Sequence, residues 1–98
     1  MPRYVVTATW TEQGVRDATA TLERARQVRQ MLSELGAAME QIYWTLGRYD
    51  VVTIMTAPDD ETIAAGVLKV AMAGGVRTEV LRAFDESEME QGVLAKIG

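Results

Sequence analysis

The chain has 98 residues, of which 48% are hydrophobic and 24% are charged, and its formal net charge is -4. This length and hydrophobic content indicate one folded domain with a modest core, and they exclude a disordered chain. The negative charge argues against a general affinity for nucleic acid or for anionic membranes, because both are bound through basic surfaces.

Cysteine and histidine are both absent from the sequence. Their absence excludes disulfides, cysteine nucleophiles, Cys or His metal ligands and His-dependent proton transfer. We therefore expect no metal and no cofactor. Any catalysis would depend on Tyr, Asp, Glu or Arg side chains or on backbone amides.

The sequence opens with strand-forming residues rather than with an apolar signal segment. No run of about 20 apolar residues occurs anywhere, so the sequence predicts no membrane-spanning helix. We expect a cytoplasmic protein that binds neither membranes nor nucleic acid.

The first predicted strand covers 4–10, which is rich in β-branched and aromatic residues, and 11–14 is predicted to form a turn. A helix is predicted over 17–35, because apolar residues recur there at steps of three and four. Gly36 stands where a left-handed C-terminal cap is expected. The apolar stripe of this helix consists of Leu22, Ala25, Val28 (or Arg29), Leu32 and Leu35.

Two further strands are predicted over 38–46 and 49–57. Only Gly47 and Arg48 lie clearly between them, which predicts a tight hairpin with a positive φ at the glycine. Pro58 ends the second of these strands, because proline cannot donate to the strand ladder.

A second helix is predicted after Asp59 or Asp60, either of which suits the N-cap position, and it ends at 73–75. A fourth strand is predicted over 76–84, followed by a short terminal helix that starts at Asp85. The expected core face of the second helix consists of Ile63, Ala64, Val67, Leu68 and Ala71.

The predicted order of elements is βαββαβ, followed by the short terminal helix. This order is the split-βαβ plan, in which right-handed crossovers place two helices on one face of a four-stranded antiparallel sheet. The sequence therefore predicts an α+β fold of ferredoxin-like topology, in a single domain that covers 1–98.

Both faces of the predicted sheet carry few charges. On the third strand, Tyr49, Val51, Thr53 and Met55 share one face, and Asp50, Val52, Ile54 and Thr56 share the other. Because the two helices cover only one face, the other needs a second cover. The candidates are the sheet of another subunit, the terminal helix folded back, or a ligand. A sheet-to-sheet homodimer, as in dimeric α/β barrels, is the simplest of these.

Five short segments follow one another in an order typical of one family. They are Tyr4-Val5-Val6, Gln13-Gly14-Val15-Arg16, Trp44-Thr45-Leu46-Gly47-Arg48-Tyr49-Asp50, Ala57-Pro58-Asp59-Asp60 and Val76-Arg77-Thr78-Glu79. Together they resemble the GYD domain family of small bacterial proteins, named for a glycine, a tyrosine and an aspartate at the hairpin. In this chain Arg48 stands between the glycine and the tyrosine. The resemblance spans nearly the whole chain and implies a ferredoxin-like, oligomeric fold, but no catalytic residue.

The hairpin and the aromatic side chains supply the candidate ligand-binding residues. Aromatic rings on the strands suit a pocket for an apolar or planar molecule, and an arginine at the hairpin suits a carboxylate or phosphate. The structural alternative is favoured for each residue singly, because aromatics also dominate cores and subunit interfaces and Gly and Asp are common in turns. The candidates are Trp10, Tyr43, Trp44, Arg48, Tyr49 and Asp50.

Two further groups of charged residues also have both a functional and a structural interpretation. The arginines of the first helix could attract an anion, but a solvated helix face is favoured. Carboxylates in the strands could supply a protonated acid if they were buried together, but exposed ion pairs are favoured. The arginines are Arg16, Arg24, Arg26 and Arg29, and the carboxylates are Glu40, Asp50 and Glu79.

Three functional hypotheses follow. The preferred one is a homo-oligomeric domain, most simply a dimer, that binds a small apolar or anionic ligand next to the sheet in a sensor or accessory role. The second is a cofactor-free isomerase or monooxygenase of the dimeric α/β barrel type, acting through Tyr, Asp, Glu or Arg. The third is a purely structural subunit.

Overall fold

A computed structural model describes residues 1–98. Its four strands are β1 (Arg3–Trp10), β2 (Ala38–Trp44), β3 (Val51–Thr56) and β4 (Val76–Ala83). Its two long helices are α2 (Thr21–Glu34) and α3 (Asp60–Met72). The shorter helical elements are α1 (Glu12–Arg16), η1 (Ala18–Ala20), α4 (Glu86–Glu88), η2 (Met89–Val93) and η3 (Leu94–Lys96).

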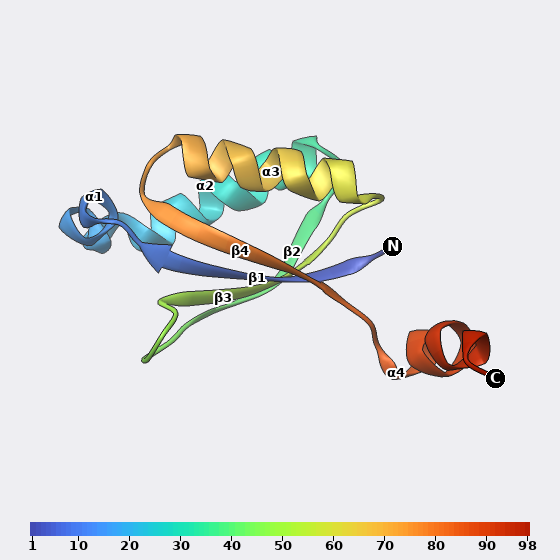
Figure 1. The fold of residues 1–98 in the computed structure, drawn as a ribbon. Coiled ribbons are helices and arrows are strands. Elements are labelled where there is room, and N and C mark those ends of the chain that lie inside the picture. Colours follow the sequence, from blue (N-terminus) through green and yellow to red (C-terminus); the bar gives the residue numbers. More distant parts are fainter.

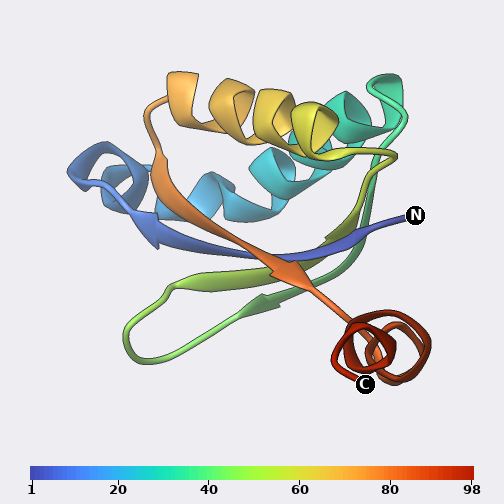
Figure 2. The ribbon, with the colours of Figure 1, turned by 45° about the vertical axis from the view of Figure 1, so that its right-hand side comes forward.

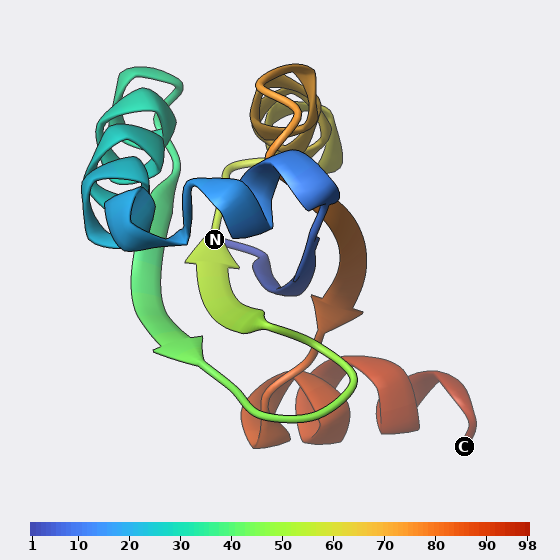
Figure 3. The ribbon, with the colours of Figure 1, turned by 90° about the vertical axis from the view of Figure 1, so that its left-hand side faces the viewer.

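The four strands form one antiparallel sheet in the order β2-β3-β1-β4. Helices α2 and α3 lie side by side on the same face of this sheet, which leaves the other face without a helical layer over it (Figures 1 and 3). The predicted α+β class and the four-stranded antiparallel sheet are thereby confirmed. None of the helices is long and apolar enough to cross a membrane.

The hydrophobic core lies between the helices and one end of the sheet. Tyr4 and Leu32 are almost completely buried there, with 2% and 1% of their surface exposed. Burying such side chains stabilises the fold by about 2 kcal/mol each. The core cluster consists of Tyr4, Val6, Leu32, Ala37, Met39, Met55, Ala57 and Ile63.

The segment between β1 and α2 differs from the prediction. Residues 11–14, which were expected to form a turn, lie largely within helix α1. Thr11 explains the difference, because its hydroxyl caps the helix by accepting a 3.2 Å hydrogen bond from the Gly14 amide. The long helix begins only at Thr21 and ends at Glu34, and Gly36 follows its C-terminal end with the expected positive φ of 81°.

Helix α3 begins as predicted but turns a different face to the core. The Asp59 carboxylate caps it by accepting a 2.7 Å hydrogen bond from the Thr62 amide. The expected core residues Ala64, Leu68 and Ala71 are exposed, so this part of the predicted face is wrong.

The inner face of α3 instead runs through Ile63, Gly66, Val67 and Val70. Gly66 sets this orientation, because a Cβ at that position would lie 2.9 Å from the Leu32 side chain on α2. The Leu32 side chain therefore lies against α3 at a position that has no side chain.

The predicted tight hairpin at Gly47-Arg48 is also wrong. Strand β2 ends at Trp44 and β3 starts at Val51, so a six-residue loop, 45–50, joins them. Asp50 explains the width of the loop, because its amide donates to the Ala8 carbonyl of β1 at 2.9 Å. Gly47 has the expected positive φ, at 123°.

The face of the sheet away from α2 and α3 is called the open face below. Strand pairing places Val5, Val52, Ile54 and Leu81 on it. Leu81 is 48% exposed and the other three are half-buried. The expectation of two apolar sheet faces is therefore met in this part of the sheet.

The terminal helical segment, 85–98, does not fold back over the open face. It projects past the end of β4, away from the two-layer body (Figures 1 and 2). Its start is as predicted, because Asp85 and Glu88 form a reciprocal capping box.

Candidate functional site

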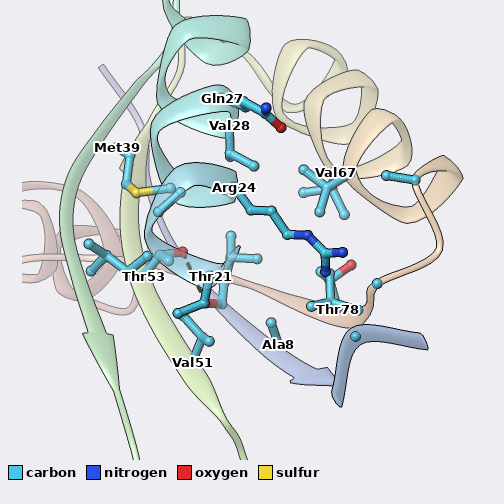
Figure 4. A pocket seen from close by; sticks show the side chains of 18 of the residues that line it. Ala8, Thr21, Arg24, Gln27, Val28, Met39, Val51, Thr53, Val67 and Thr78 are labelled. Atoms are coloured by element: carbon cyan, nitrogen blue, oxygen red, sulfur yellow. Dashed lines mark hydrogen bonds between the residues drawn. The ribbon is translucent and has the colours of Figure 1, made fainter. Parts of the chain in front are cut away.

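A cavity of about 330 Å³ lies between α2, α3 and the sheet (Figure 4). It occupies the end of the helix-covered face that is away from Tyr4 and Ile63. Most of α2, the second half of α3 and all four strands contribute to its wall. A volume of this size is sufficient for a small organic molecule.

Small side chains explain why this end of the interface is hollow. Along the inner face of β1 the residues shrink from Tyr4 through Val6 to Ala8, and Ala8 forms part of the cavity floor. Ala25 on α2 and Gly66 on α3 are similarly small. The remaining wall is mainly aliphatic, with Val28, Met31, Val51, Val67, Val70 and Val76 among its residues.

The charged residues of the cavity wall are Asp17, Lys69 and Arg24. Arg24 carries a guanidinium group. Its side chain leaves α2 and extends across the cavity toward Thr78 on β4 (Figure 4). One nitrogen, Nη2, donates to the Asp17 carboxylate at 2.9 Å. Because a guanidinium has five N–H donors, Arg24 retains donors for a further acceptor.

Two glycines allow Arg24 and α1 to close one end of the cavity. A Cβ on Gly75 would lie 2.7 Å from the Arg24 Nη1 atom, and a Cβ on Gly14 would lie 2.0 Å from the Gly75 carbonyl oxygen. Thr11 ties the same loops together, because its hydroxyl donates to the Gly74 carbonyl at 2.6 Å. This end wall therefore depends on direct backbone contact.

Two of the six predicted ligand-binding residues line the cavity. Trp10 and Trp44 are both part of its wall, and they are the only tryptophans of the chain. The indole N–H of Trp44 donates to the Thr21 hydroxyl at 2.9 Å, which links β2 to α2.

The other four predicted residues lie outside the cavity lining. Tyr43 is 54% exposed on the open face. The Arg48 guanidinium lies 5.5 Å from the centre of the Tyr49 ring. The Asp50 carboxylate accepts a 2.8 Å hydrogen bond from the Trp10 amide, so its visible role is to hold the loop. A ligand-binding role for any of the six stays a prediction.

Sequence reasoning named Arg24 only as one of four helix arginines that could attract an anion, and it favoured a solvated face for all four. Two of these, Arg16 and Arg26, do form exposed ion pairs with Glu12 and Glu23. The available signal was the place of Arg24 beside Ala25 on the edge of the apolar stripe. An arginine at the edge of a stripe can turn its long side chain inward.

The strand carboxylates have separate partners. Glu40 pairs with Arg3 at 3.4 Å, and Glu79 accepts a 3.3 Å hydrogen bond from the Tyr49 hydroxyl. No group of three or more His, Cys, Asp or Glu side chains is placed to hold a metal ion.

The groups with shifted pKa values do not line the cavity. Burial raises the pKa of Tyr4 to about 12, and the hydrogen bond of its hydroxyl to the Asp60 carboxylate, at 2.5 Å, adds to the shift. The hydrogen bonds from Thr62 lower the pKa of Asp59. Both residues serve the start of α3 rather than a reacting centre.

Comparison with known proteins places the chain in a family. The family model of the GYD domain matches residues 4–93. A protein of Thermus thermophilus, named glutamine synthetase and cystathionine beta-lyase binding protein, is 32% identical over 90 residues, which cover 91% of this chain and 95% of that protein. The crystal structure of TTHA0845, also from Thermus thermophilus, has a similar fold, with a TM-score of 0.55, 24% identity and coverage of 87% of this chain and 95% of the other. The chain therefore belongs to the GYD domain family.

Proposed function

We propose that this chain is an accessory protein that binds a small, mainly apolar molecule with one polar or anionic end in the cavity between the helices and the sheet. The observation that carries the proposal is the combination of an aliphatic wall with a single guanidinium, Arg24, at its edge. Ligand sites in proteins typically combine apolar walls with a few placed polar groups.

The orientation of the ligand follows from the polar groups of the wall. Arg24 and Thr78 lie together at one side of the cavity (Figure 4). A carboxylate there would accept charge-assisted hydrogen bonds from Arg24 while the apolar part of the ligand fills the space above Ala8.

We further propose a ferredoxin-like topology and a homo-oligomeric assembly for the chain. The element order and the sheet order β2-β3-β1-β4 support the ferredoxin-like topology expected from the sequence. The apolar residues of the open face support a homo-oligomer, because exposed apolar patches mark interaction surfaces.

The accessory role is supported by the relative that is named for binding two enzymes. We carry over to this chain only the general property of associating with other proteins. An enzymatic role has less support, because Tyr4 and Asp59, the side chains with shifted pKa values, do not line the cavity.

Tryptophan fluorescence provides the direct test, because both tryptophans line the cavity. The unmodified protein would be titrated with decanoate and benzoate, and with the neutral analogues decanol and benzyl alcohol. We expect saturable changes in emission and tighter binding of the acids. No saturable change with any of the four probes would contradict the proposal.

A matched pair of variants locates the bound probe. Ala8→Phe places a ring in the cavity, whereas Thr9→Phe places the same ring on the opposite face of β1. Decanoate should bind at least about tenfold more weakly to the first variant and normally to the second.

A second pair tests the charge. Arg24→Gln should remove the preference for acids over alcohols, because the guanidinium at the cavity is lost. Arg26→Gln is the control, since Arg26 is an exposed arginine on the same helix that also has a carboxylate partner. Equal preferences in the two variants would exclude Arg24 as the anion-binding group.

A further inference from the structure

The terminal segment 85–98, called the terminal arm here, has an apolar side that packs on no other element. Ile97 is 79% exposed, Leu94 is 53% exposed and Met89 is 36% exposed. The main contacts of α4, η2 and η3 are with one another. Isolated helices shorter than about 12–15 residues are marginal in water, so a helical arm needs a surface to pack against.

The base of the arm is fixed at the end of its own sheet. Asp85 pairs with Arg3 at 3.7 Å, and Glu88 pairs with Arg82 at 3.2 Å. From this base the helical turns run outward, past the end of β4 (Figures 1 and 2). In this arrangement the arm lies away from its own open face.

The open face is the matching surface on the same chain. Val5, Val52 and Ile54 form an apolar strip across β1 and β3, and Leu81 continues it on β4. An apolar strip of this kind marks an interaction surface.

The unpaired charges of the two surfaces are complementary. Glu86 and Glu90 on the arm form no ion pair within the chain. Arg77 on the open face also has none, and it stands at the edge strand where an approaching arm would meet it. Complementary charges of this kind fix the orientation of two surfaces.

We infer that the terminal arm of one copy packs on the open face of a second copy, and that the exchange is reciprocal. Two copies related by a twofold axis would cover both apolar surfaces at once, because each contributes an arm and receives one. The inference rests on the homo-oligomer part of the proposed function and is independent of the cavity. It replaces direct sheet-to-sheet contact with a helical layer between the copies.

The absence of cysteine allows a clean cross-linking test. Ile54→Cys in one sample and Leu94→Cys in another, one of them carrying a mass tag, would be mixed and treated with a short bismaleimide. We expect a cross-link between the two different copies. The control mixes Leu94→Cys with Leu68→Cys, since Leu68 is exposed on α3 in the opposite layer. Equal cross-linking in the two mixtures would overturn the inference.

Light scattering on a second variant separates the arm from the rest of the proposal. Leu94→Glu combined with Ile97→Glu should halve the mass in solution, while the thermal melt of the body and the decanoate titration stay unchanged. A dimer that survives this change but dissociates with Ile54→Glu would show sheet-to-sheet contact and overturn the arm exchange. A wild-type protein that is monomeric throughout would overturn both the arm exchange and the proposed homo-oligomer.

Discussion

The two ends of the helix-covered sheet face use the same strands and helices with opposite results. At the packed end, Tyr4, Ala57 and Ile63 belong to the core cluster and leave almost no surface exposed. At the hollow end, Ala8 and Gly66 occupy equivalent inward positions and a cavity of about 330 Å³ remains. Side-chain volume, and not secondary structure, separates a core from a binding site here.

The largest expected difference between the two ends is in the stability lost when a side chain is truncated to alanine. Ile63→Ala, at a residue that is 3% exposed, should lower the free energy of unfolding by about 3 kcal/mol, because truncation at the packed end leaves a new void that cannot collapse. Val67→Ala at the cavity wall should cost about 1 kcal/mol, since the space beside it is already open. Urea unfolding of both variants measures this, and equal losses would mean that the two ends are packed alike.

The next largest loss of stability is expected at the end wall of the cavity. Gly14→Ala would place a methyl group 2.0 Å from the Gly75 carbonyl oxygen, so backbone must move. We expect a loss of about 2 kcal/mol in the free energy of unfolding. Gly92→Ala is the control, because a Cβ there meets nothing within 4 Å, and it should be neutral or stabilising. Similar thermal melts for the two variants would refute the close contact.

Enlarging an alanine at each end reverses the truncation experiment. Ala57→Leu at the packed end, where the residue is 0% exposed, should destabilise by about 1–3 kcal/mol through overpacking. Ala8→Leu at the hollow end should change stability by less than about 1 kcal/mol, because the added carbons enter free space. Chemical denaturation distinguishes the two, and a severe loss for Ala8→Leu would show that the cavity closes in solution.

The smallest effect is a pH dependence that belongs to the packed end. The pKa of Tyr4 is raised from 10.0 to about 12, so the folded state holds the proton more tightly than the unfolded state does. The stability that results is fully present below pH 10 and is lost as the pH rises toward 12. Tyr4→Phe should flatten this part of the stability profile, measured by urea unfolding between about pH 9 and 11. An unchanged slope would show that Tyr4 titrates normally.

Much of the fold could be predicted from the sequence because its signals were local. Alternating strands, the cap at Asp59 and the positive φ of Gly36 each depend on a few adjacent residues. The inner face of α3 could not be assigned in the same way. Its orientation depends on the contact between Gly66 and Leu32, which lie on different helices.

The candidate site was harder to predict, because a cavity is defined by side chains that are missing. Trp10 and Trp44 were identified by their aromatic character, and both line the cavity. Arg24 was assigned to the solvent because an arginine on a helix is usually exposed. Only the tertiary arrangement shows that the space beside it, above Ala8, is empty enough to receive its side chain.

The wide hairpin loop illustrates the same limit. Gly47 and Arg48 suggested a tight turn, but Asp50 lies in the loop and its carboxylate binds the Trp10 amide, 40 positions away in the chain. Such a long-range hydrogen bond cannot be predicted from the residues next to it in the sequence.

The most direct test of the binding site is an NMR titration of the ¹⁵N-labelled chain with decanoate. We expect shifts of the indole N–H signals of Trp10 and Trp44 and of amides around Ala8 and Thr78, while the signals of the packed end around Tyr4 stay unchanged. Shifts confined to the open face, or no shifts at saturating decanoate, would contradict the proposed binding site.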